Sequence, residues 1–270
     1  MDVHVRHDGR WMGAITSRPL PEDDSLVQLG AMQRLTLADV WHGRAASERR
    51  VSDAFRVVRD ALVSLEAPRD LVELATRAID DEMRHAELSR VVASRYAGER
   101  LEHPPRLSLD VPPHVGASAR LRNILHVVGQ CAFNETIASA FLEAALAEAT
   151  APLARSALRE LLSDEIDHAR IGWALLASLD PVTRREVERW LPAMAIANLR
   201  MWRDAHRTYG ADPLLSAHGA PSVESTERAL LVAFRELILP GFAHLGMATT
   251  ALESWLRSET DGAPTRAREV

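Results

Sequence analysis

Two short stretches decide how this sequence folds: DEMRH at Asp81–His85 and DEIDH at Asp164–His168. In each, an Asp-Glu pair is followed by a His three residues after the Glu. With 11 His in 270 residues, this double coincidence has odds of roughly 0.002 by chance. Side chains three residues apart share one face of a helix, so the carboxylate and the imidazole can reach a common metal ion. The two stretches therefore predict two helices that each supply Glu-x-x-His.

Helical spacing of apolar residues extends over most of the chain, and no stretch alternates like a β-strand. The pattern predicts an all-α fold. The expected helices lie at about 35–66, 71–95, 117–149, 152–179, 183–206 and 223–257, the last kinked at Pro240.

The lone glutamates that would complete such a site follow from the geometry of a helical hairpin, because ligands at equal height lie equally far from the turn. Glu165 follows a break near residue 150, and an equal distance back reaches Glu135. Glu82 follows a break near residue 68, and the nearest Glu able to reach it from the preceding helix is Glu48. The candidate ligands are Glu48, Glu82, His85, Glu135, Glu165 and His168.

The connection between the second and third helices is long. AGERLEHPPRLSLDVPPHVG, residues 97–116, contains four prolines and predicts a segment without helix. Two hairpins that contribute ligands at mid-height need parallel second and third helices, so this segment must return along the bundle; about 19 extended residues reach roughly 60 Å. We expect an arm at 1–34, a four-helix domain at 35–180 and two C-terminal helices at 181–270.

With these ligands the chain resembles the ferritin-like non-haem di-iron carboxylate superfamily over about residues 40–180. The resemblance implies a four-helix bundle with a long crossover between helices 2 and 3. The Asp before each Glu is similar to the DExxH form of bacterial multicomponent monooxygenase hydroxylases and ribonucleotide reductase small subunits. That similarity implies that Asp81 orients His168 and that Asp164 orients His85, each fixing an imidazole tautomer.

The resemblance also implies a function: an O2-dependent oxidase or monooxygenase that oxidises a small organic substrate at two Fe ions, or at an Mn/Fe or di-Mn pair. Four glutamates carry −4 and two Fe(II) carry +4, which makes burial of the site tolerable. Such an enzyme needs electrons, and no flavin or nicotinamide site is evident, so an external ferredoxin or reductase is expected. The alternative is a ferroxidase, an iron-handling protein or a peroxide scavenger of the same fold.

Three further residues refine this interpretation. Cys131 and Ser139 lie one turn either side of Glu135. Core packing is expected for Cys131, whereas Ser139 stands where the resembling hydroxylases carry a Thr near O2. Ser89 stands where a radical Tyr would lie, which argues against a ribonucleotide-reductase-like role.

Composition excludes other classes of protein. All 32 basic residues are Arg, which rules out lysine Schiff-base chemistry, and the single Cys rules out an internal disulfide or a CxxC pair. A net charge of −6 without a basic stripe argues against a nucleic-acid partner. No apolar stretch approaches the roughly 18 residues of a membrane span, and no signal peptide is evident, so we expect a cytoplasmic protein. The C-terminal helices would shape a pocket or a dimer interface, which leaves a homodimer open.

Overall fold

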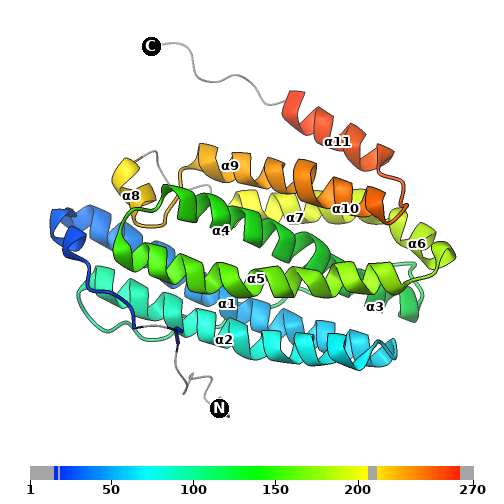
Figure 1. Cartoon of the computed structure of the whole chain (residues 1–270), viewed down its shortest axis with the longest axis horizontal. Coiled ribbons are helices and arrows are strands. Elements are labelled where there is room, and N and C mark those ends of the chain that lie inside the picture. Colours follow the sequence, from blue (N-terminus) through cyan, green and yellow to red (C-terminus); the bar gives the residue numbers. More distant parts are fainter. Residues whose placement is uncertain (1–14, 18, 206–211, 262–270) are drawn as a thin grey trace.

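The structure is a computed structural model that describes residues 15–17, 19–205 and 212–261, and every regular element within these ranges is helical (Figure 1). The predicted all-α class is confirmed. The first half of the chain comprises the short 3₁₀-helix η1 (Asp24–Gln28), α1 (Ala31–Ser64), α2 (Arg69–Ala97), α3 (Ala119–Val127), the π-helix η2 (Val128–Glu135), α4 (Thr136–Glu148) and α5 (Pro152–Ser178).

The helix α1 begins at Ala31, four residues before the predicted start of the helical domain. Gly30 is its N-cap, and the Gly30 N–H donates to Oε1 of Gln33 at 2.9 Å. This hydrogen bond satisfies a backbone donor that would otherwise have no partner at the helix start. The predicted arm at 1–34 therefore overlaps α1, and its residues 1–14 and 18 lie outside the described residues.

The long helices pack in sequence around a shared interior. α1 packs on α2 and α3, α2 packs on α5, and α5 packs on η2 and α4. Residues 98–118 form the predicted connection without helix, and it returns along the molecule to α3, so α2 and α4 run in the same direction (Figure 1). Side chains hold this connection in place: Arg49 of α1 donates to the Pro104 carbonyl at 3.2 Å, and His126 of α3 lies 3.1 Å from the Pro112 carbonyl.

The prediction of two C-terminal helices is wrong. The structure has instead α6 (Pro181–Glu188), α7 (Leu191–Ala205), α8 (Pro213–Ala217), α9 (Val223–Val232), the π-helix η3 (Ala233–Ile238), α10 (Leu239–His244) and α11 (Thr250–Asp261).

Single residues with special backbone properties explain why these helices begin and end where the apolar pattern predicted none. Gly246 has φ 71°, a left-handed conformation that favours glycine, and it closes α10 where the apolar pattern had predicted a helix continuing to 257. Pro240 lies in the first turn of α10, directly after the π-helix η3. The helix predicted to be kinked at Pro240 is therefore divided there into a π-helical segment and a new α-helix. Asp212 caps α8 through Leu214 N–H, inside the expected loop.

The interior consists of two apolar clusters. One includes Phe55 and Leu62 of α1, Ala75 of α2 and Ile171 of α5. The other includes Trp41 of α1, with Leu88, Val92 and Tyr96 of α2 and Leu158 of α5. Along each of these helices, the predicted ligand residues fall between the two clusters. The candidate site is thus a polar layer between two apolar clusters of the interior.

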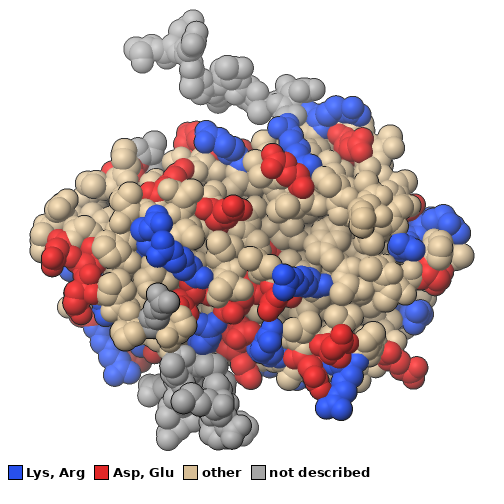
Figure 2. All heavy atoms as spheres, viewed as in Figure 1, with Lys and Arg blue, Asp and Glu red and all other residues tan. Residues whose placement is uncertain are grey.

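The surface carries mixed charge. On the face shown in Figure 2, acidic and basic side chains are interspersed and neither sign forms a continuous patch. Among the described helices, none is long and apolar enough to cross a membrane.

Candidate metal centre

The structure brings all six predicted ligand residues together. Their ligand atoms form two groups, and within each group one atom per residue lies within 4.8 Å of the others. The first group is Glu48, Glu82, His85 and Glu165, and the second is Glu82, Glu135, Glu165 and His168.

The two groups share Glu82 and Glu165, the glutamates of the two Glu-x-x-His stretches. Each group then adds one lone glutamate and one histidine of its own. A carboxylate has two oxygens and can bind one ion with each. The cluster therefore offers two overlapping groups of possible metal ligands that have two carboxylates in common.

The buried polar atoms of the cluster are poorly satisfied by the protein alone. Glu82 is 0% exposed, and neither of its carboxylate oxygens has a hydrogen-bond partner; the same holds for Nδ1 of His85. Buried polar groups are otherwise almost always paired, because an unpaired one costs about 1–3 kcal/mol. Unpaired oxygen and nitrogen atoms that converge on one place fit a bound cation.

Both histidines point one ring nitrogen inward and the other toward an aspartate. Nδ1 of His168 lies 3.0 Å from Glu82 Oε1 and 3.1 Å from Glu165 Oε2. On the outer side, His85 Nε2 lies 3.0 Å from Asp164 Oδ2, and His168 Nε2 lies 3.6 Å from Asp81 Oδ2. Each aspartate thus faces the histidine of the other helix, as the resemblance implied.

Burial and mutual charge shift the pKa values of the acidic and basic groups in the cluster. Burial and the charges of Glu82 and Glu165 raise the pKa of Glu48, and burial with the same two charges raises the pKa of Glu135. Burial opposes the charged form of His85, but the hydrogen bond to Asp164 and the nearby carboxylates of Glu165 and Glu82 outweigh it and raise the pKa of that imidazole. The hydrogen bonds and charges of His168 and His85 instead lower the pKa of Glu165 against the effect of burial. The buried carboxylates therefore favour added positive charge, either as protons or as a cation.

Glu135 is held by a network that depends on the π-helix. Gln130 Nε2 donates to Glu135 Oε1 at 2.5 Å, and Asn134 Nδ2 donates to the same oxygen at 3.3 Å. Trp202 of α7 donates from Nε1 to Asn134 Oδ1 at 2.9 Å. A π-helix bonds residues five apart, which brings Gln130 next to Glu135. Such segments occur often at functional sites, and this one ends at a candidate ligand.

Sequence reasoning missed several residues around the site. Gln130, Asn134 and Trp202 gave no signal, because their contacts depend on η2 and on the position of α7. Arg84 was also missed: it contacts Asp164 closely and lies 3.9 Å from Asp81, so one guanidinium faces both aspartates. Its place beside His85 in the DEMRH stretch was the only available hint.

Cys131 and Ser139, the two residues expected near Glu135, make contacts that are common in helix packing. Cys131 is fully buried in the apolar core, and burial raises the pKa of its thiol well above the usual value. Ser139 Oγ donates to the main-chain carbonyl of Glu135 at 2.9 Å. Packing for Cys131 is confirmed, and the hydroxyl of Ser139 is used within its own helix.

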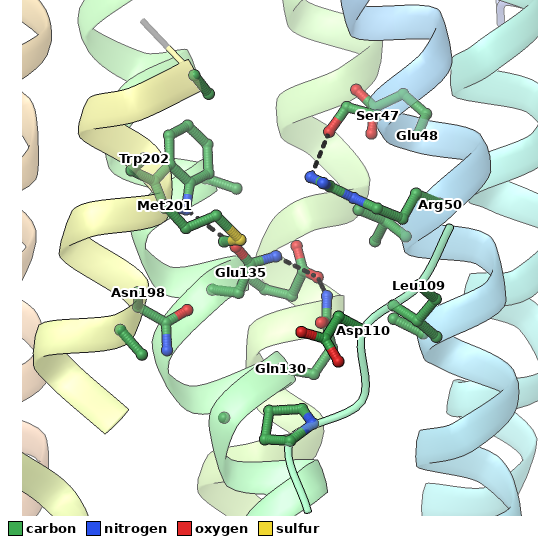
Figure 3. Close-up of a pocket in the computed structure, with 18 of the residues that line it drawn as sticks. Ser47, Glu48, Arg50, Leu109, Asp110, Gln130, Glu135, Asn198, Met201 and Trp202 are labelled. Carbon is green, nitrogen blue, oxygen red and sulfur yellow. Dashed lines mark hydrogen bonds between the residues drawn. The ribbon is translucent and has the colours of Figure 1, made fainter. Parts of the chain in front are cut away.

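A cavity of about 860 Å3 reaches the cluster from the outside (Figure 3). Its walls come from α1, the 108–114 segment, η2, α4 and α7. Three candidate ligands, Glu48, Glu135 and Glu165, line it, whereas Glu82, His85 and His168 do not. The volume is within the range of small-molecule sites.

No protein-family model matches the chain, and neither does any of the curated proteins or solved structures compared with it.

Asp164→Asn is expected to weaken metal binding about 10–100-fold, because the amide no longer fixes the His85 tautomer and loses its charge pairing with Arg84. Isothermal titration with Mn(II) measures the change. Asp167→Asn is the matched control, because Asp167 lies one turn away and pairs with Arg77 at 3.1 Å. Equal losses in both variants would contradict an orienting role for Asp164.

Proposed function

We propose that this protein is an O2-dependent di-metal oxidoreductase of the ferritin-like carboxylate type that oxidises a small organic substrate. The observation that carries the proposal is the sharing of Glu82 and Glu165 by two four-residue groups of possible ligands. The packing of α1, α2, α5 and the α3–η2–α4 stretch, with a long connection after α2, is compatible with a ferritin-like bundle.

In this proposal Glu48 and His85 would hold one ion, Glu135 and His168 would hold the other, and Glu82 and Glu165 would be available to both. Four carboxylates and two imidazoles suit iron or manganese better than structural zinc, which prefers four ligands and often thiolates. A bound pair of iron ions, or manganese in one or both positions, would supply O2 activation and electron exchange.

The chain's own residues prepare the site for that chemistry. Asp164 accepts a hydrogen bond from His85 Nε2 at 3.0 Å, and the Asp81 carboxylate faces His168 Nε2 at 3.6 Å. Both aspartates favour the tautomer with the proton on Nε2, which leaves the Nδ1 lone pair facing inward. Arg84 balances the charge of both aspartates. The apolar clusters on either side limit water at the carboxylates and strengthen their electrostatic interactions.

The cavity favours oxidation of an organic molecule over iron storage. An 860 Å3 space with mostly apolar walls opens onto three of the carboxylates, and storage of hydrated ions needs no such walls. The proposal includes a separate electron donor, because the single Cys is buried in the core and cannot form a redox pair.

Metal analysis and O2 uptake test the proposal. We expect about two Fe per chain after anaerobic loading, and rapid O2 consumption by the reduced, loaded protein. A folded protein that binds no Fe or Mn would overturn the assignment. A large assembly that accumulates many Fe per chain would favour the iron-handling alternative instead.

A further inference from the structure

The cavity is elongated, and the carboxylates open into its middle. Its α1 wall extends from Val40 to Val58, which is ~27 Å along the helix axis. Glu48 lies near the centre of this stretch, and Glu135 and Glu165 face the cavity from other helices. A molecule that fills the cavity therefore passes the site along its length.

Most of the wall is apolar. Valines of α1 line the cavity, as do Trp190, Met194 and Met201 of the α7 region. Met201 lies across the cavity from Glu48 and Arg50 of α1 (Figure 3). On α7, Ala193 and Ala197 are exposed and small, so the cavity is open along this helix. Walls of this kind bind hydrocarbon through burial of apolar surface.

The charged groups on the wall are few. Apart from the three candidate ligands, they are Arg44, Arg50 and Asp110, two cations and one anion. Arg44 stacks on the Trp41 ring at 4.3 Å from its centroid. Once bound ions balance the glutamates, the remaining wall charge is positive.

Arg50 is the cation best placed to receive a ligand. It extends from α1 into the cavity beside Ser47, and Nη2 donates to Ser47 Oγ at 3.4 Å (Figure 3). No carboxylate of the described residues lies within 4.0 Å of its guanidinium, whereas Arg56 on the same helix is paired with Asp53 at 2.5 Å. A guanidinium presents a planar fork of donors that matches an oxyanion.

We propose that the substrate of this site is an elongated, mostly apolar molecule with one oxyanion group, a carboxylate or a phosphate, that pairs with Arg50. This inference rests on the proposed function and names its substrate class. The apolar part lies along the α1–α7 walls, past Glu48 and Glu135. Arg50 lies only ~3 Å from Glu48 along the axis of α1, so the oxyanion is held beside the site and the oxidised position lies near that end of the molecule.

Ligand titrations on the full-length protein test the inference, with Mn(II) and without it. The probes are dodecanoate, dodecyl phosphate, dodecanol and dodecyltrimethylammonium, followed by isothermal titration. We expect one of the two anions to bind most tightly, which identifies the oxyanion. Arg50→Gln should weaken that binding about tenfold and leave dodecanol unchanged. Arg59→Gln, on the same helix but outside the cavity wall, should change neither.

A second pair of variants tests the apolar part. Ala197→Trp fills the open side of the cavity from an exposed position, so it should abolish binding of the anion without loss of folding. Ala147→Trp, at an exposed position outside the cavity, should have no effect. Equal binding of all four probes, or an anion affinity unaffected by both Arg50→Gln and Ala197→Trp, would overturn the inference. The titrations without Mn(II) report ligand binding alone, so failure of this inference can be distinguished from failure of the proposed metal site.

Discussion

Glu82→Gln is expected to abolish binding of both metal ions. Glu82 belongs to both groups of possible ligands, and an amide lacks the second anionic oxygen that a shared position needs. Metal per chain should fall from about two to below one-half, measured by mass spectrometry after gel filtration. The metal-dependent rise in unfolding temperature should disappear with it, because a ligand at 100 times its Kd stabilises by about 2.7 kcal/mol.

The stability of the metal-free variant separates a functional carboxylate from a structural one. Glu82 is fully buried, and its oxygens lie 3.0 Å from His168 Nδ1 and 3.4 Å from His85 Nδ1. The neutral amide loses these two ion pairs but also removes the desolvation cost of a buried charge, so metal-free Glu82→Gln should unfold no earlier than the metal-free parent. Glu143→Gln, an exposed glutamate of α4, controls for charge and should change neither measurement. A metal-free Glu82→Gln protein that is clearly destabilised would instead indicate that the ion pairs of Glu82 with His85 and His168 stabilise the metal-free fold.

The parts of the site that follow from local spacing could be predicted from the sequence. Glu-x-x-His is local, because three residues of α-helix fix the relative direction of the two side chains. Counting residues outward from the turn between α1 and α2 also identified Glu48 as a candidate ligand. The residue of α2 at the same distance from this turn is, however, His85 and not Glu82. Glu48 lies sixteen residues before the end of α1 at Ser64, and His85 sixteen after the start of α2 at Arg69.

The parts that depend on the third dimension could not be predicted. A π-helix differs from an α-helix by a single backbone hydrogen-bond shift, and VGQCAFNE carries no pattern that marks it. The contact between Trp202 and Asn134 needs the position of α7, which follows from packing and not from spacing. The extra C-terminal helix ends depend on single residues such as Gly246, which an apolar periodicity does not register.

Gly172→Ala is expected to lower the free energy of unfolding by about 3 kcal/mol. A Cβ at this position would lie 2.5 Å from the Ala132 backbone nitrogen and 2.9 Å from Cys131 Cβ. Both atoms belong to the π-helix η2, and a backbone atom cannot move without moving the helix. Chemical denaturation of the metal-free protein measures the loss.

The same substitution should also weaken one ion position more than the other. Gly172 lies one turn after His168 on α5, and Cys131 and Ala132 lie one turn before Glu135 on η2. A helix pair forced apart here separates Glu135 from His168, whereas Glu48 and His85 belong to α1 and α2 and keep their distance. Titration should then show one weakened and one retained Mn(II) site.

Gly43→Ala is the matched control, and it should change the free energy of unfolding in the opposite direction. Gly43 lies in the middle of α1, and a Cβ there would meet nothing within 4 Å. Alanine at an open helical position should raise stability by about 0.5–1 kcal/mol, since glycine costs conformational entropy in a helix. If Gly172→Ala proved as harmless as Gly43→Ala, α5 and η2 would have to be further apart than in this structure. The spacing that brings Glu135 to Glu165 and His168 would then be wrong as well.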